Sequence, residues 1–200
     1  RHSDMFKRKR VRLTSPAGVA KYPYLTNPDT QFSPEGEYKV SLLLDPAEHG
    51  EFLSRLDELV DKAVEQAKKE LIEKGRKAQA KQVLRQDPYR EEYDEQGEPT
   101  GRVEVRFKSK ALVKTRGGKT LELRPALFDA KGQPINPNDI SIYGGSVIRV
   151  NFTPRPYYIA GTRLAGVTLQ INAVQVLELV SGGMGGTAES FGFDVEEDGF

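Results

Sequence analysis

The sequence predicts a mainly β protein, an antiparallel Greek-key barrel with one long helical insertion and a disordered acidic tail. Three observations lead to this fold class. Five or more short runs have the period of two, or the continuous apolar character, of strands. One long stripe with a helical period follows the second run. Few segments are long enough for parallel crossovers. Among small antiparallel barrels, the OB-fold fits this arrangement.

Composition limits the classes of function. The 200 residues are enough for one domain with a real core, and no apolar run is long enough to span a membrane. The absence of cysteine excludes a disulfide framework, a thiolate nucleophile and a zinc ribbon, and it fits a reducing cytoplasm. The start lacks an apolar secretory segment. Residues 1–5 are assigned to a cloning remnant and the natural start, and residues 6–181 to the folded domain.

The charge is distributed unevenly along the chain. Residues 182–200 contain five of the 29 acids and no lysine or arginine, which leaves 24 acids against 30 basic residues in the body. A basic body with an acidic tail indicates a polyanionic partner and a tail that competes for the same surface.

The N-terminal third is basic and then rich in turns. The segment Phe6–Leu13 is strongly basic, and Val11 and Leu13 alternate with charged residues, so a first strand is expected to begin there. The segment Ser15–Gly36 has the prolines and glycines of a loop or an edge strand. It carries Tyr22 and Tyr24, which are candidates for stacking on bases. We expect Phe32 instead to close one end of the barrel.

A buried strand and a long helix come next. Tyr38–Leu44 becomes continuously apolar, as a buried strand does. Asp45 suits the N-cap and Pro46 the first helical position, so a helix is predicted over residues 46–74, ending at Gly75. Its apolar stripe is most simply explained by core packing.

A polar stretch at residues 86–101 reads as a surface excursion. Its carboxylates are neighbours in sequence rather than ligands gathered from rigid elements. They therefore give little support to a magnesium-dependent nuclease, and neither a metal nor another cofactor is expected. The carboxylates are Asp87, Glu91, Glu92, Asp94 and Glu95.

The clearest strand is Arg102–Val113. Its period of two places Arg106, Lys108 and Lys110 on one face, opposite the core. Such a row is a candidate phosphate track, although lysines on an outward strand face are also common. The choice depends on whether this face adjoins the tip of the last hairpin.

That hairpin consists of the runs Ser146–Phe152 and Leu164–Val180. Aromatic rings interleaved with guanidinium groups suit stacking on unpaired bases and contact with phosphates. The alternative is an ordinary hairpin whose tyrosines pack on the body. The residues concerned are Arg155, Tyr157, Tyr158 and Arg163.

The last segment begins with a glycine-rich linker and continues as an acidic stretch with interspersed aromatics. Its apolar content is too low for independent folding, so disorder is expected. The acids before a terminal aromatic have the pattern of a docking motif for a basic pocket. The proposed docking residues are Asp194, Glu196, Glu197, Asp198 and Phe200.

Several short motifs occur in an order that is similar to a known family. The chain resembles the phage single-stranded DNA-binding proteins of the type found in short-tailed coliphages, over Ser15–Val180 and the tail. The motifs are Gly36-x-Tyr38-Lys39-Val40, Phe107-Lys108, Gly144-Gly145, Pro156-Tyr157 and Gly166-Val-Thr-Leu-Gln-Ile171.

The resemblance implies an OB-fold that coats single-stranded DNA in phage replication and recombination, in the cytoplasm of an infected bacterium. It implies a tail that contacts replication proteins, polymerase and helicase/primase, and that shields the DNA site; a second copy of the chain is a further candidate partner. Tyr157 takes the place of the family's base-stacking tyrosine, and Arg106 and Lys108 that of basic groove residues. Glu35 stands where the family can carry an arginine, and Ile159 where an aromatic can occur.

The main hypothesis is therefore a non-enzymatic protein that binds single-stranded DNA with little sequence preference. The alternatives are an RNA-binding OB-like module, a magnesium-dependent nuclease and a structural β-protein. The predicted stacking residues are Tyr157, Tyr158, Tyr22 and Tyr24. The predicted phosphate contacts are Arg106, Lys108, Lys110, Arg155, Arg163 and Lys39.

Overall fold

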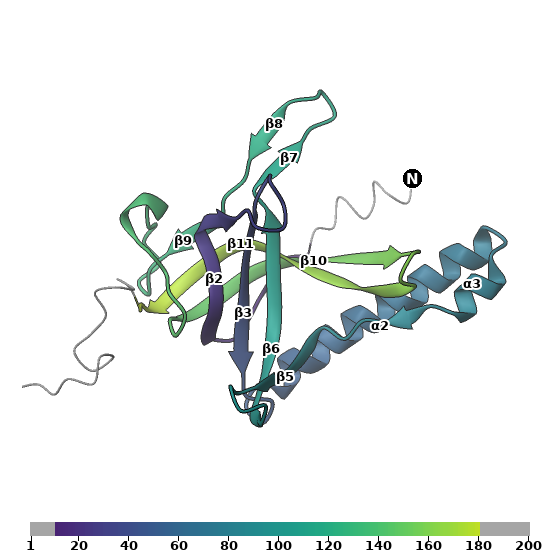
Figure 1. The fold of residues 1–200 in the computed structure, drawn as a ribbon, viewed down its shortest axis with the longest axis horizontal. Coiled ribbons are helices and arrows are strands. Elements are labelled where there is room, and N and C mark those ends of the chain that lie inside the picture. The colour runs from purple at the N-terminus through teal and green to yellow at the C-terminus, as the bar shows by residue number, and fades with distance from the viewer. Residues whose placement is uncertain (1–10, 181–200) are drawn as a thin grey trace, which may run out of the picture.

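The computed structural model describes residues 11–180, which form a β-barrel beside one long helix (Figure 1). The expected disordered tail lies outside the described residues, as does most of the first basic segment. No helix within residues 11–180 has the length and apolar character that a membrane span requires. The elements are β1 (Leu13–Thr14), β2 (Gly18–Asp29), β3 (Glu37–Leu44), α2 (Gly50–Glu73), α3 (Lys77–Lys81), β4 (Leu84–Arg85), β5 (Tyr89–Tyr93), β6 (Pro99–Lys110), β7 (Leu112–Lys114), β8 (Thr120–Glu122), β9 (Ala126–Phe128), η1 (Pro137–Asp139), β10 (Val147–Ile159) and β11 (Leu164–Glu178).

The barrel is closed by five strands that pair out of sequence order. β2, β3 and β6 form an antiparallel series, and β10 pairs with both β2 and β11. β11 then runs parallel to β6 and completes the ring. This is the Greek-key arrangement of an OB-fold, so the predicted fold class is confirmed.

Aromatic packing joins the long helix to the barrel core. The rings of Phe107 and Phe152, on β6 and β10, meet edge to face with centroids 5.1 Å apart. Phe52, from the first turn of α2, meets Phe152 at 6.0 Å. The first half of α2 therefore covers the barrel, and burial of these apolar surfaces stabilises the fold.

The helix begins later than expected, at Gly50 rather than Pro46. The side chain of Asp45 accepts a hydrogen bond from the backbone of Ala47 at 2.9 Å, and so forms a turn before the helix instead of capping it. The predicted end is correct. Gly75 has a φ of 75°, and hydrogen bonds from Gly75 and Arg76 to the last helical turn make a Schellman motif.

The second half of α2 packs under the β10–β11 hairpin (Figure 1). A small apolar cluster joins α2, α3 and β11, and short β4 lies parallel to β11 with a hydrogen bond from Leu84 N to Arg163 O of 2.7 Å. The hairpin tip is thus held against the helices. The cluster consists of Ala67, Leu71, Ala80, Val83 and Ala165.

The polar stretch at residues 86–101 is not the loop expected from its sequence. It forms β5, which pairs with β6 in the register Tyr89↔Val105 and Tyr93↔Pro99. Glu92 is buried there because cations on β2 and β6 neutralise it. These partners are distant or on the opposing strand, so the local composition gave no sign of them.

Candidate nucleic-acid interface

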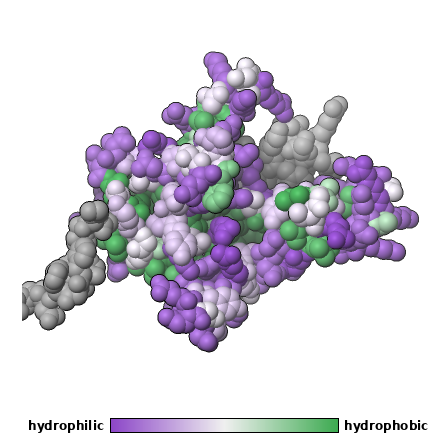
Figure 2. Space-filling model, in the orientation of Figure 1, coloured by the Kyte–Doolittle hydropathy of each residue, from purple (hydrophilic) through white to green (hydrophobic). Residues whose placement is uncertain are grey.

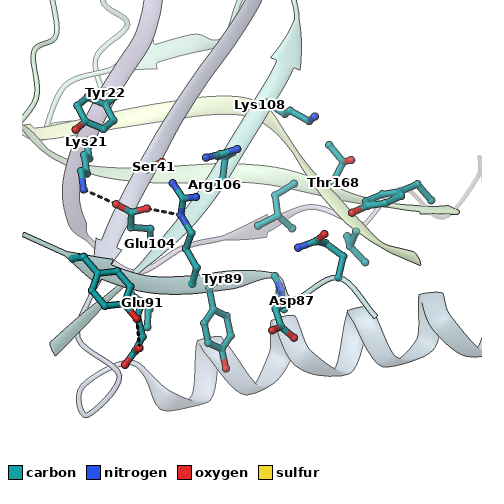
Figure 3. A pocket seen from close by; sticks show the side chains of 18 of the residues that line it. Lys21, Tyr22, Ser41, Asp87, Tyr89, Glu91, Glu104, Arg106, Lys108 and Thr168 are labelled. Carbon is teal, nitrogen blue, oxygen red and sulfur yellow. Dashed lines mark hydrogen bonds and ion pairs between the residues drawn. The ribbon is translucent and has the colours of Figure 1, made fainter. Parts of the chain in front are cut away.

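A cleft of about 1310 Å³ lies on the outward face of the barrel. Its floor and walls come from β2, β3 and β6, from residues 86–93, and from the facing strands of the β10–β11 hairpin. In Figure 3, Lys21 and Tyr22 lie at one side, Lys108 and Thr168 at the other, and Arg106 between them. The sequence-predicted strand face and the hairpin therefore meet at one site.

Arg106 and Lys108 supply positive charge to this cleft. Both are exposed on β6, because their neighbours Val105 and Phe107 point into the core. Among residues 11–180, neither side chain takes part in an ion pair, so both are free to contact phosphates. Lys110 is exposed at the end of the same strand but does not line the cleft.

Tyr157 lines the cleft from β10 and is held over a glycine. It is the cross-strand partner of Gly166, and a Cβ added to that glycine would lie 2.8 Å from the Tyr157 hydroxyl oxygen. The ring thus occupies space that a side chain at 166 would fill. Burial raises the pKa of the Tyr157 phenol above its ordinary value of 10.0. A half-buried ring that shares a cleft with two exposed cations suits base stacking.

Tyr158 faces the other way. Successive strand residues point to opposite sides of the sheet, and Tyr158 packs on the apolar cluster of the helices. It does not line the cleft. Tyr158 was predicted to supply a second stacking face; in the structure helix α2 occupies its side of the hairpin, so it does not share the cleft with Tyr157.

The two arginines of the hairpin have different surroundings. Arg155 is exposed beside the cleft, opposite the cleft residue Thr168, and its Nε donates a hydrogen bond to Gln170. Arg163 lies in the turn with a φ of 63°, away from the cleft lining. Its backbone N–H donates to Ile159 O at 2.8 Å, so this residue also helps to fix the turn.

The tyrosines of β2 are separated by a bulge. Tyr22 is 72% exposed with a φ of 51°, and it lines the same cleft as Tyr157. Tyr24 lies outside the cleft, with the Lys39 ammonium 5.3 Å from its ring centroid. Lys39 also pairs with Asp29 at 2.5 Å. A phosphate at Lys39 would therefore compete with a carboxylate that is already in place.

Phe32 does not close the end of the barrel as expected. It is 87% exposed, in the turn between β2 and β3. The ammonium of Lys39 lies 5.3 Å from the centroid of its ring. The available signal was its setting between two polar residues in a turn-rich segment, which leaves the ring no apolar partner nearby in sequence.

Sequence reasoning missed a network of buried carboxylates beside the cleft. Glu104 accepts hydrogen bonds from Lys21 at 2.6 Å and from Arg90 at 2.8 Å, and Glu92 accepts from Arg102 at 2.9 Å. Burial alone would raise the pKa of Glu104, but the hydrogen bonds from Lys21 and Arg90 outweigh it and hold that pKa below its ordinary value. The sequence signal for this network was Glu104, an acidic residue on the face of β6 that also carries Arg106 and Lys108.

These carboxylates fix cations rather than gather for a metal. Within residues 11–180, no group of three or more potential ligand side chains could hold a metal ion. The surface over the β10–β11 hairpin mixes hydrophobic and hydrophilic side chains (Figure 2). Such a mixed surface, with free cations and a tyrosine ring, matches the chemistry of a single nucleic-acid strand, whose bases are apolar and whose phosphates are charged.

Comparisons with known proteins show the family of the chain. The family model of the bacteriophage T7 single-stranded DNA-binding protein matches residues 17–179. The single-stranded DNA-binding protein of Enterobacteria phage T3 is 30% identical over 208 aligned residues, covering 96% of this chain and 86% of that protein. These relatives are named as binding proteins, which is a non-enzymatic function.

Solved structures show the same fold. The crystal structure of gp2.5, a single-stranded DNA-binding protein of bacteriophage T7, matches with a TM-score of 0.71 and 25% identity over 96% of this chain and 98% of that chain. The single-stranded DNA-binding protein of bacteriophage Enc34, in complex with ssDNA, matches with a TM-score of 0.55 and 18% identity over 85% and 88% of the two chains. The chain therefore belongs to the family of phage single-stranded DNA-binding proteins that includes the protein of bacteriophage T7.

Proposed function

We propose that the chain binds single-stranded DNA in the cleft between β6 and the β10–β11 hairpin. The observation that carries this proposal is that Tyr157 shares one cleft with Arg106 and Lys108, two cations that form no ion pair within residues 11–180. Bases would stack on Tyr157, and on Tyr22 in the same cleft, while phosphates meet the cations. Stacking is worth about 1–3 kcal/mol per base and tolerates any sequence, because every base has a π-face.

The cleft shape favours a single strand over a duplex. Bases of a duplex are already stacked on one another and cannot reach a ring inside a cleft without unpairing. The charge of the site is also mixed, since Glu104 and Asp87 lie among the lining residues. Free energy from stacking is therefore needed in addition to phosphate contacts, and only unpaired bases supply it.

The tail and its partners form a second part of the proposal. The acids and Phe200 at the C-terminus have the composition of a segment that docks on basic surfaces, such as those of phage replication proteins. The same negative charge complements Arg106 and Lys108 in the cleft, on this chain or on a second copy in a homodimer. The setting would be the cytoplasm of an infected bacterial host, in replication and recombination of phage DNA.

A salt-dependent titration tests the binding proposal. Labelled oligo-dT and a matched duplex would be titrated with the full chain at about 50 and 200 mM salt, where phosphate contacts predict a marked loss of affinity. We expect the single strand to bind much more tightly than the duplex. A matched RNA strand as competitor separates DNA from RNA binding. Equal affinity for duplex and single strand would contradict the proposal.

A further inference from the structure

An exposed aromatic cluster lies outside the cleft, at the turn between β2 and β3. Phe32 is the most exposed of the large hydrophobic side chains in residues 11–180, at 87%. The ammonium of Lys39 lies 5.3 Å from the centroid of the Phe32 ring and 5.3 Å from that of the Tyr24 ring. The cation lies close to both rings, so Phe32, Tyr24 and Lys39 form one unit, here called the β2–β3 aromatic cluster.

The turn that carries Phe32 is anchored at both ends. Asp29 accepts a hydrogen bond from the backbone N–H of Gln31 at 3.0 Å and forms an ion pair with Lys39. Gly36, with a φ of 90°, accepts from the backbone of Ala111 at 3.1 Å. The ring is therefore presented to solvent by a braced turn. Because the Phe32 side chain is exposed, it contributes little hydrophobic stabilisation to the fold of the free protein.

The strand register connects this cluster to the cleft. Tyr24 pairs with Lys39, Lys39 with Lys108, and Lys108 with Gln170, across four neighbouring strands. Paired residues share one face of a sheet, and neighbouring strands lie about 4.8 Å apart. Tyr24 therefore lies roughly 10 Å from Lys108, a lining residue of the cleft, with one further cation between them.

We propose that the β2–β3 aromatic cluster is a second base-stacking station, reached by a DNA strand that leaves the cleft across β6 and β3. Phe32 and Tyr24 would stack bases, while Lys39 stays paired with Asp29 and lies close to both rings. This inference rests on the proposed function, and it extends that function by giving the path of the strand. It also means that short DNA oligonucleotides bind in the cleft alone, whereas longer ones contact both the cleft and the β2–β3 aromatic cluster.

The absence of tryptophan from the sequence allows a direct test. Phe32→Trp introduces a single fluorophore at the cluster. Ile72→Trp places the same fluorophore on the exposed outer face of α2, as a matched control. The ligand is oligo-dT of about 20 nucleotides, longer than the roughly 4–16 that one OB-fold covers. We expect the fluorescence at position 32 to be quenched on binding and that at position 72 to stay unchanged.

Affinity measurements show whether the contact contributes to binding. Phe32→Ala and Phe32→Leu should weaken binding of this oligonucleotide about 5- to 150-fold, the equivalent of one stacked base. Phe32→Tyr keeps a ring and should bind like the wild type. Because the side chain is exposed, circular dichroism should show all three variants folded. If Phe32→Leu bound the oligonucleotide as tightly as the wild type, an aliphatic side chain would be sufficient at this position, and base stacking by Phe32 would be contradicted.

The outcomes separate this inference from the proposed function. If the wild-type chain binds oligo-dT but Phe32→Ala binds it equally well, the second station does not exist, whether or not the tryptophan is quenched. If the wild-type chain itself does not bind oligo-dT, the proposed function fails. Loss of affinity in Phe32→Ala, together with quenching at position 32 only, supports the station.

Discussion

The ring of Tyr157 lies over Gly166, its partner on the opposing strand of the hairpin. A Cβ at position 166 would come within 3.1 Å of the Tyr157 Cζ and 3.0 Å of the Gln86 Cβ. Glycine opposite an aromatic residue is a known way to seat a ring on a sheet. Gly166 is thus a positioning residue for the tyrosine that we assign to base stacking.

Gly166→Ala should weaken oligo-dT binding by displacing this ring. The φ of Gly166 is not in the left-handed region, so alanine fits the backbone and the tyrosine, rather than the strand, should move. In a Tyr157→Ala background the same change should cause no further loss, because the ring is already absent. Additive losses in this double-mutant cycle would show that Gly166 acts in some other way.

Removal of the two free cations should change the salt dependence. Arg106→Gln and Lys108→Gln should each reduce the slope of log K against log salt by about 0.7, as expected for one phosphate contact to a single strand. Lys62→Gln, on the exposed side of α2, is the matched control and should leave the slope unchanged. An unaltered slope in both cleft variants would exclude these residues as phosphate contacts.

Tyr158 should matter for stability rather than for stacking. Its ring packs on the cluster formed by Ala67, Leu71 and their neighbours, so Tyr158→Ala should lower the free energy of unfolding by about 1–2 kcal/mol. Urea denaturation measures this effect. The folded variant should keep the oligo-dT affinity of the wild type. If Tyr158→Ala were as stable as the wild type but did not bind oligo-dT, Tyr158 would have to contact DNA, and its assignment to packing would be contradicted.

The buried carboxylates should make stability sensitive to acid. Hydrogen bonds from cations hold the pKa of Glu104 below its ordinary value of 4.5, so the unfolded chain takes up the proton first as pH falls. The stabilisation is therefore complete above pH 4.5 and is lost as the pH falls through the lowered, folded-state pKa. Glu104→Gln should be less stable at pH 7 and should lose less stability between about pH 5 and pH 3. If the free energy of unfolding fell equally with pH in the wild type and in Glu104→Gln, this assignment would be contradicted.

The parts of the structure that follow from local periodicity were predictable. The alternation in β6 placed Arg106 and Lys108 outward, and the helical stripe gave α2, although the predicted helix began about one turn too early. The order of strands also identified the barrel. These features depend on which side of a segment is apolar, and the sequence shows that directly.

The parts that depend on distant partners were not predictable. Tyr157 and Tyr158 are neighbours with the same chemistry, and only the position of α2 decides which of them faces the cleft. Glu92 looked like a loop carboxylate because Lys21, its partner, lies 71 residues away. Phe32 was expected to close the barrel; its polar neighbours favoured exposure, but the direction in which its turn projects depends on the two strands that the turn joins.

The most direct measurement compares oligo-dT affinity in Tyr157→Ala and Tyr143→Ala. Tyr143 is exposed and does not line the cleft, so its removal controls for the general loss of a surface tyrosine. We predict that Tyr157→Ala weakens binding roughly 5- to 150-fold, the value of one stacked base, while Tyr143→Ala leaves it unchanged. Equal affinities of wild type and Tyr157→Ala would contradict the assignment of this cleft as the DNA site.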